Sequence, residues 1–145
     1  MKIESSRFTA GGAIPQAHTC EGQDVSPPLQ WSEVPATAKS LALIVDDPDA
    51  PLGTWVHWVV FDIPPATARI EEGGVPGKQG RNDFRRNAYG GPCPPSGTHR
   101  YFFKLYALDT LLNLGERATK ADVEKAMAGH ILGKAEVMGT YQRKR

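Results

Sequence analysis

Three carboxylates crowd one short and stiff segment of this sequence. Asp46, Asp47 and Asp49 directly follow an apolar run, and Pro48 and Pro51 restrict the backbone between and after them. Carboxylates held close together raise one another's pKa and attract cations, so the spacing suits acid–base chemistry or a metal ion. Asp and Pro also dominate solvated Asx-type turns, and the spacing alone leaves both interpretations open.

A histidine lies at the start of a second apolar run. Trp55 and His57 are two residues apart, so in a strand they share one face, which we expect Val59 and Phe61 to continue inward. A lone histidine on such a face is more often a satisfied core residue than a ligand. His57 therefore gains interest only if other polar groups converge on it.

The third polar segment combines an imidazole with a phenol. By strand alternation His99 and Tyr101 point to one side and Arg100 to the other, so two hydrogen-bond donors face a shared space. The stiff loop at 90–95 (GGPCPP) precedes them, and we expect its glycine amides to form an anion-binding nest. Both histidines, Tyr101 and Asp47 lie at strand ends beside stiff loops, so together they suit a pocket for a small oxyanion. Neutral or charged imidazoles would donate to it, and the nearby aspartate would favour the imidazolium form.

Strands and turns must position these groups. The run at 40–46 (SLALIVD) suits a strand buried on both faces, and the run at 55–63 (WVHWVVFDI) ends at a Pro-Pro pair that cannot extend a ladder. A third strong strand is expected at 99–108. Weaker strands are expected at 3–8, 29–31, 69–72 and 135–142.

One amphipathic helix is expected near the C-terminus. Thr119 and Asp122 form a capping-box-like pair, and the apolar positions that follow keep helical spacing. Gly129 or Gly133 would stop it. The sequence therefore predicts a mostly β chain with a minor helix, in one domain spanning 1–145.

Composition excludes several classes of protein. The 145 residues carry a net charge of +1 with acids and bases mixed, which gives no electrostatic reason to expect a nucleic acid partner. No apolar run is long enough to cross a bilayer, and residues 1–5 lack the apolar stretch of a signal peptide, so we expect a cytoplasmic location. The basic cluster at 143–145 is interpreted as a solvated tail.

Standard catalytic motifs are absent. The sequence has no H-E-x-x-H, G-x-S-x-G, phosphate-binding glycine loop or C-x-x-C. A His/Asp metal site built from Asp47, Asp49, His57 and His99 would lack a defining spacing, and we expect neither a metal nor a cofactor. Cys93 is the best candidate nucleophile, but its proline neighbours indicate rigidity more than catalysis. Two reduced thiols, Cys20 and Cys93, are the default for a reducing compartment.

Six stretches in a fixed order resemble the phosphatidylethanolamine-binding (Raf kinase inhibitor-like) protein family, in particular its short bacterial and archaeal branch. The combination of D-P-D-A-P with G-x-H-R-Y is specific, and the likeness spans nearly the whole chain. The matching stretches are 26–31 (SPPLQW), 47–51 (DPDAP), 55–58 (WVHW), 89–95 (YGGPCPP), 97–101 (GTHRY) and 137–141 (VMGTY).

The resemblance implies two antiparallel sheets with Greek-key topology, one or two short peripheral helices and a preformed pocket for phosphate-like groups. It also implies a structural ion pair between Asp49 and Arg100 beneath the pocket, and a backbone N–H at Cys93 directed at the anion. Because longer eukaryotic members add a C-terminal helix to the rim, we expect a more open pocket here. Carried over by motif, the ligand-binding residues are Asp47, Pro51, Trp55, His57, Cys93, Pro95, His99 and Tyr101.

The function expected on this basis is binding rather than catalysis. The ligand would be a small phosphorylated or carboxylated anion, and the protein would regulate or inhibit a partner such as a kinase or a protease. The alternative is a hydrolase that uses the His/Asp cluster in the same pocket as acid and base. The resemblance is also compatible with a homodimer, and with a disulfide between Cys20 and Cys93, since the family places both loops near the pocket.

Overall fold

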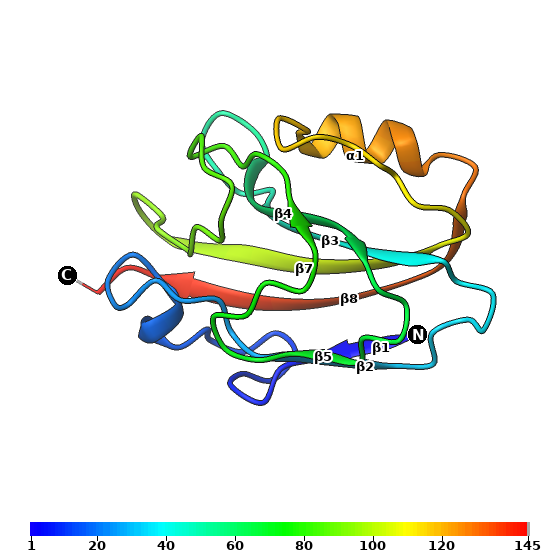
Figure 1. Cartoon of the computed structure of the whole chain (residues 1–145). Coiled ribbons are helices and arrows are strands. Elements are labelled where there is room, and N and C mark those ends of the chain that lie inside the picture. Colours follow the sequence, from blue (N-terminus) through cyan, green and yellow to red (C-terminus); the bar gives the residue numbers. More distant parts are fainter. Residues whose placement is uncertain (145) are drawn as a thin grey trace.

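Two antiparallel sheets and one helix form three layers in the computed structural model, which describes residues 1–144 (Figure 1). The small sheet has the strand order β1-β2-β5 and the large sheet the order β6-β4-β3-β7-β8. The elements are β1 (Lys2–Glu4), the 3₁₀ helix η1 (Gln16–His18), β2 (Leu29–Ser32), β3 (Ser40–Asp47), β4 (Trp55–Ile63), β5 (Arg69–Ile70), β6 (Lys78–Gln79), β7 (Thr98–Leu108), α1 (Lys120–Met127) and β8 (Ile131–Gln142).

The chain order of the large sheet is not a simple meander. β3 pairs with its neighbour β4 on one side and with the distant β7 on the other, and every named pairing is antiparallel. Between β4 and β7 the chain crosses to the small sheet, where it adds β5, and returns to the edge strand β6. The predicted fold class, mostly β with two antiparallel sheets and a peripheral helix, is confirmed.

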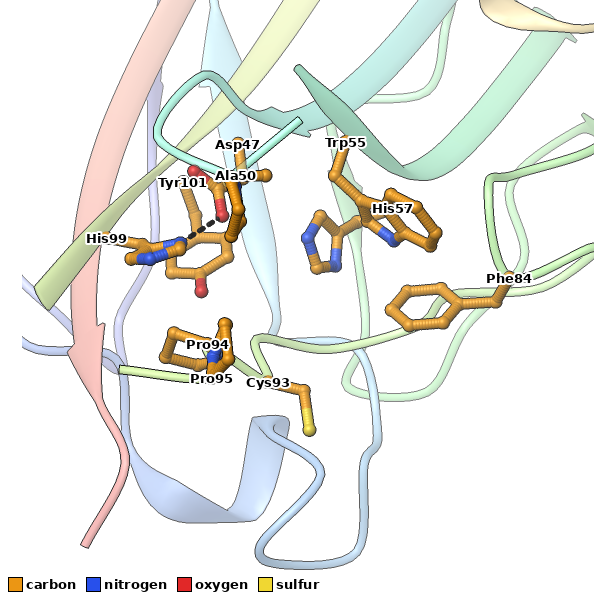
Figure 2. Close-up of a pocket in the computed structure, with 11 residues that line it drawn as sticks. Asp47, Ala50, Trp55, His57, Phe84, Cys93, Pro94, Pro95, His99 and Tyr101 are labelled. Carbon is orange, nitrogen blue, oxygen red and sulfur yellow. Dashed lines mark hydrogen bonds and ion pairs between the residues drawn. The ribbon is translucent and has the colours of Figure 1, made fainter. Parts of the chain in front are cut away.

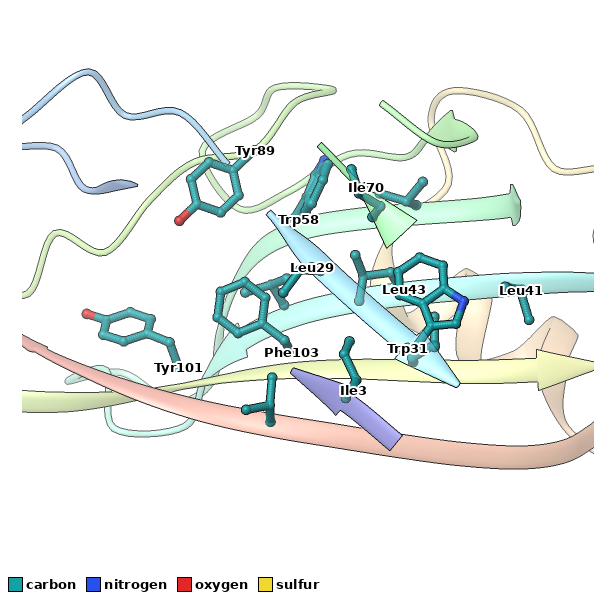
Figure 3. Packing of buried hydrophobic residues seen from close by; sticks show 14 of the residues in the cluster. Ile3, Leu29, Trp31, Leu41, Leu43, Trp58, Ile70, Tyr89, Tyr101 and Phe103 are labelled. Atoms are coloured by element: carbon teal, nitrogen blue, oxygen red, sulfur yellow. The ribbon is translucent and has the colours of Figure 1, made fainter. Parts of the chain in front are cut away.

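The main core lies between the two sheets, where side chains from both inner faces interdigitate (Figure 3). The small sheet contributes Ile3, Leu29 and Trp31, which alternate with exposed residues along their strands. Opposite them lie Leu43 of β3 and Phe103 of β7, both fully buried. Burial of apolar surface on this scale is the main stabilising contribution in a domain of this size.

A second core lies on the outer face of the large sheet, under α1. Val123 and Met127 of the helix pack on Ile44 and Phe61, so β3 is buried on both faces as its continuous apolar run predicts. Thr119 caps the helix in a complete capping box with its third residue, as predicted.

Consecutive carboxylates at the end of β3 point to opposite faces of the large sheet. Asp46 is buried on the helix side, where Lys120 Nζ lies 2.8 Å and Lys104 Nζ 3.2 Å from its Oδ2. Asp47 points to the inter-sheet side, as strand alternation requires. The two acids therefore belong to different electrostatic environments.

Element boundaries differ from prediction at the weaker strands. β8 begins at Ile131, because Gly133, predicted as a helix stop, continues the ladder with β7 instead, and α1 ends before Gly129, whose φ is +81°. β1 ends at Glu4, and the short edge strand β6 was not predicted. No helix among residues 1–144 is long and apolar enough to span a membrane.

Candidate functional site

One pocket of about 220 Å³ opens where β3 ends and β4 and β7 begin (Figure 2). Because β3 runs antiparallel to β4 and β7, the end of β3 and the starts of β4 and β7 lie at the same end of the sheet, and segments far apart in the sequence meet there. Every predicted ligand-binding residue lines this pocket, together with three that were not predicted. The lining residues are Asp47, Ala50, Pro51, Trp55, His57, Phe84, Cys93, Pro94, Pro95, His99 and Tyr101.

A buried aspartate–histidine pair forms one wall. His99 Nδ1 lies 2.6 Å from Asp47 Oδ2, and both side chains are less than a tenth exposed. The other carboxylate oxygen of Asp47 accepts the backbone N–H of Asp49 at 2.7 Å. Both oxygens of Asp47 are therefore used, and the carboxylate orients the imidazole so that Nε2 remains for other partners.

The hydroxyl of Tyr101 has no hydrogen-bond partner among residues 1–144, although the residue is only 1% exposed. Figure 2 shows this hydroxyl directed into the space between the two histidines and the proline loop. Burial, and after it the negative charge of Asp47, raises the pKa of Tyr101 far above its usual range. The phenol therefore stays protonated and serves as a hydrogen-bond donor.

A β-bulge turns His57 into the pocket. Val45 pairs with Trp58 and Asp46 with Val56, so His57 is an extra residue between two ladder positions. His57 consequently shares the pocket side with Tyr101, and the two rings meet edge to face at 5.2 Å.

The bulge contradicts the predicted alternation along β4. Val59 and Phe61 pack in the helix-side core, not on the face of His57. The run of apolar residues gave no sign of the inserted position, because both faces of this strand are apolar.

The surroundings of His57 oppose the imidazolium form that a nearby aspartate was expected to favour. Burial lowers its pKa, and this effect is larger than the raising effects of the Gly90 carbonyl and the Asp47 charge. His57 Nδ1 lies 2.7 Å from the Gly90 carbonyl oxygen and must carry the proton of the neutral ring. Nε2 is then a hydrogen-bond acceptor.

The predicted glycine nest is absent, because both glycine amides are used inside the chain. Gly90 donates to the His57 carbonyl at 3.0 Å, and Gly91 donates to Asp24 Oδ1 at 2.7 Å. A Cβ atom on Gly91 would stand 2.2 Å from the His18 carbonyl oxygen, so the glycine is needed for close packing. The backbone N–H of Cys93, in contrast, finds no acceptor among residues 1–144.

Cys20 and Cys93 form a disulfide, so the default expectation of two reduced thiols is wrong. The bond joins loops 73 residues apart in sequence, a proximity that spacing cannot report. The cytoplasmic location stays a prediction, since disulfides are typical of oxidising compartments but also occur inside hyperthermophile cells.

Arg143 was predicted to lie in a solvated tail, yet it contacts this disulfide. Its Nη2 lies 2.9 Å from Cys93 Sγ and 3.7 Å from Cys20 Sγ, and the residue is half-buried. Lys144 is exposed, and Arg145 lies outside the described residues.

The predicted ion pair between Asp49 and Arg100 is present. Arg100 Nε and Nη2 donate to the two carboxylate oxygens at 2.9 and 2.8 Å, and its backbone N–H adds a bond of 3.0 Å. The guanidinium lowers the pKa of Asp49 to about 2. This pair anchors the loop that follows β3 to the start of β7.

Phe84 is the main pocket residue that sequence reasoning missed. Its ring meets Trp55 at 5.5 Å and His57 at 5.3 Å, and Figure 2 shows it at the end of the site opposite His99. Asn82 holds this loop on β4: its Nδ2 donates to the His57 carbonyl and its Oδ1 accepts the Phe84 amide. The adjacent Asn-Asp pair signals a turn, but not where the turn docks.

The polar groups of the pocket form a mixed set of donors and acceptors. The Tyr101 hydroxyl donates, His57 Nε2 accepts, and His99 adds its Nε2, which the bond between Nδ1 and Asp47 leaves for another partner. Such a set suits an oxyanion that carries a proton of its own. No three His, Cys, Asp or Glu side chains within 1–144 are grouped to hold a metal ion.

Comparison with known proteins gives concordant matches in sequence and structure. The family model for phosphatidylethanolamine-binding protein matches residues 4–142. A UPF0098 protein of Methanothermobacter thermautotrophicus is 53% identical, with 99% of each chain covered, and one of Pyrococcus abyssi is 50% identical, with 97% of this chain and 84% of that protein covered.

Solved structures agree. A phosphatidylethanolamine-binding protein homologue from Chlamydia trachomatis superimposes with a TM-score of 0.96 at 43% identity, covering 99% of this chain and 97% of that one. Escherichia coli YbcL, described as a member of the mammalian family, gives 0.91 at 34% identity, covering 99% and 98%.

Proposed function

Because this chain belongs to the phosphatidylethanolamine-binding protein family, we propose that its pocket binds a small phosphoryl or carboxyl anion. The observation that carries the proposal is the buried Tyr101 hydroxyl, which has no partner among residues 1–144 and points into the pocket. An unsatisfied buried hydroxyl costs about 1–3 kcal/mol, so a ligand oxygen that accepts its proton gains binding energy there.

The size and polarity of the pocket support a phosphate-sized group. Its volume of about 220 Å³ is below the roughly 300–1,000 Å³ of pockets that bury drug-sized ligands. Tyr101 and the Cys93 amide would donate to two anion oxygens, while neutral His57 Nε2 would accept the proton of a monohydrogen phosphate. A carboxylic group fits the same pattern with fewer contacts.

We further propose that the protein regulates or inhibits a partner protein such as a kinase or a protease. Leu52, on the loop beside the pocket, is fully exposed, and Trp55 at the mouth is 39% exposed. Apolar side chains around an anion pocket favour a ligand group presented by a larger molecule. Among the described residues, the pocket lining holds no serine, threonine or lysine, and its cysteine is in a disulfide, which favours binding over turnover.

A hydrolase is the second candidate, and one observation favours it. Asp47 orients His99 at 2.6 Å, the arrangement of a general base held in place by a carboxylate. In this reading His99 would activate a water against a bound ester, and Tyr101 would donate to the developing oxyanion.

Calorimetric titration with inorganic phosphate tests the binding proposal. We expect saturable binding at one site that is lost in His57→Ala and His99→Ala and kept in His130→Ala, which removes an exposed histidine outside the pocket. An absence of binding by the wild type at millimolar phosphate would refute the proposal. Turnover of a phosphoester or carboxylester that disappears in Asp47→Asn would support the hydrolase instead.

A further inference from the structure

The two sulfurs of the disulfide differ in exposure and surroundings. Cys20 is exposed, whereas Cys93 is half-buried and lines the pocket. Only Cys93 has a guanidinium nitrogen within 3 Å of its sulfur, that of Arg143 at 2.9 Å. We propose that this disulfide is a reversible thiol–disulfide exchange site, which opens by attack on Cys20 and releases Cys93 as a thiolate in the pocket wall.

The reductant would be a dithiol, and the exchange has two steps. One thiolate of the dithiol bonds to Cys20 Sγ, the Cys20–Cys93 bond breaks, and its electron pair leaves with Cys93. The second thiolate of the dithiol then attacks the dithiol sulfur that is bonded to Cys20, and the Cys20 thiolate leaves. The protein disulfide gains two electrons, the dithiol becomes a disulfide, and its two protons pass to solvent or to the released thiolates.

Arg143 determines which of the two sulfurs leaves as the thiolate. A thiolate leaves more readily when a neighbouring cation stabilises it. Glu21 is the carboxylate whose charge acts on Arg143, and it accepts hydrogen bonds from the Tyr141 hydroxyl and the Lys144 amide. No carboxylate oxygen among residues 1–144 forms an ion pair with this guanidinium, so Cys93 Sγ is the closer of its two described acceptors.

The surrounding hydrogen bonds hold both loops in place without the disulfide. Cys20 donates its amide to the Pro92 carbonyl at 3.1 Å, and Tyr89 donates its hydroxyl to the His18 carbonyl at 2.8 Å. The Gly91 amide adds its bond to Asp24. Both thiols would consequently stay close after reduction, so that the bond can form again.

Opening the bond would also change the pocket, a consequence that rests on the proposed function. A Cys93 thiolate adds a negative charge to a wall where an anion is proposed to bind. Like charges at close range repel, so the reduced protein is expected to bind phosphate more weakly, by about tenfold.

The exchange is tested on the native protein with glutathione and with dithiothreitol. We expect reduction without denaturant, and peptide mapping of the glutathione mixed disulfide after acid quenching should place it on Cys20. Arg143→Gln should slow reduction about tenfold, whereas Lys144→Gln, which removes a neighbouring cation with no contact to either sulfur, should not. A mixed disulfide mainly on Cys93, or reduction only in denaturant, would overturn the proposal.

A second measurement separates a charge effect from a packing effect of Arg143. In Cys20→Ser the single thiol Cys93 is alkylated with iodoacetamide across pH, and half-maximal rate is expected below the pH of about 8.5 typical of a free thiol. Adding Arg143→Gln should move this midpoint upward, and adding Lys144→Gln should leave it in place. Identical midpoints in all three proteins would refute the role of Arg143.

The anion consequence has its own comparison. Phosphate affinity is measured for the oxidised and the reduced protein, at a pH below and a pH above the alkylation midpoint of Cys93. We expect the reduced protein to bind more weakly than the oxidised protein only above that midpoint, where Cys93 is a thiolate. Equal affinity of oxidised and reduced protein above the midpoint would refute the coupling, whereas no binding to the oxidised protein would refute the proposed function and leave the exchange test unaffected.

Discussion

Replacing Tyr101 by Phe removes one hydroxyl and should change stability and phosphate affinity in opposite directions. The ring contacts with His57 at 5.2 Å and His99 at 6.5 Å are kept, because Phe has the same ring. The hydroxyl lost is buried and has no partner among residues 1–144, so its cost of about 1–3 kcal/mol disappears with it. We expect the ligand-free variant to be more stable by about 1 kcal/mol.

Phosphate affinity should fall in the same variant. A hydrogen bond to a charged group contributes about 1.5–3 kcal/mol, which corresponds to about 10- to 150-fold in Kd. Because a ligand stabilises the folded state by RT ln(1 + [L]/Kd), the gain in stability that phosphate gives the wild type should shrink accordingly. The wild type and the variant should therefore exchange their order of stability as phosphate is added.

Urea unfolding at several phosphate concentrations measures both effects in one assay. Tyr106→Phe is the matched control, since Tyr106 lies on the opposite face of the same strand, outside the pocket. This variant should have the wild-type Kd for phosphate, and phosphate should stabilise it as much as it stabilises the wild type. A ligand-free Tyr101→Phe protein destabilised by more than about 1 kcal/mol would show that the hydroxyl has a structural partner, and an unchanged Kd would refute its contact with the anion.

Three further outcomes follow from the described contacts. Because burial lowers the pKa of His57 below its ordinary 6.5, the unfolded chain binds protons at this site more readily than the folded protein, and the free energy of unfolding should fall as pH drops below about 6.5. Urea unfolding at each pH should show a less steep fall in His57→Gln than in the wild type or in His130→Ala. The pKa of Asp49, lowered from 3.8 to about 2, contributes stability that is present above pH 3.8 and lost as pH falls through 2, so acid unfolding of Asp49→Asn should be less steep there. Thr119→Ala should cost about 1 kcal/mol through loss of the helix cap, and exposed Thr37→Ala close to nothing, by thermal or urea unfolding.

The regular elements could be predicted because their signals are local. A continuous apolar run predicted β3, a Pro-Pro pair marked the end of β4, and the spacing of Thr119 and Asp122 predicted the cap of α1. The position of Asp47, the two histidines and Tyr101 at strand ends predicted that they converge, and the family likeness added the remaining pocket residues, Pro51, Trp55, Cys93 and Pro95.

The predictions that the structure contradicts concern contacts between segments far apart in the sequence. The bulge at His57 is set by pairing with β3, and the bond between Cys20 and Cys93 depends on where two loops meet. The amides of Gly90 and Gly91 looked free in the sequence, but a carbonyl and a carboxylate from other segments accept them. None of these partners is close enough in the chain to leave a pattern.

Asp46 and Asp47, which point to opposite faces of the large sheet, help to set the register in which β3 pairs with its neighbours. All residues of Ser40–Asp47 are buried, and apolar side chains occupy both faces, so a slip of one residue would still bury hydrophobic groups. Such a slip would, however, take Asp46 away from its lysines and Asp47 away from His99. An unpaired buried charge costs about 3–5 kcal/mol, so these two acids discriminate between alignments that hydrophobic burial alone would treat almost equally.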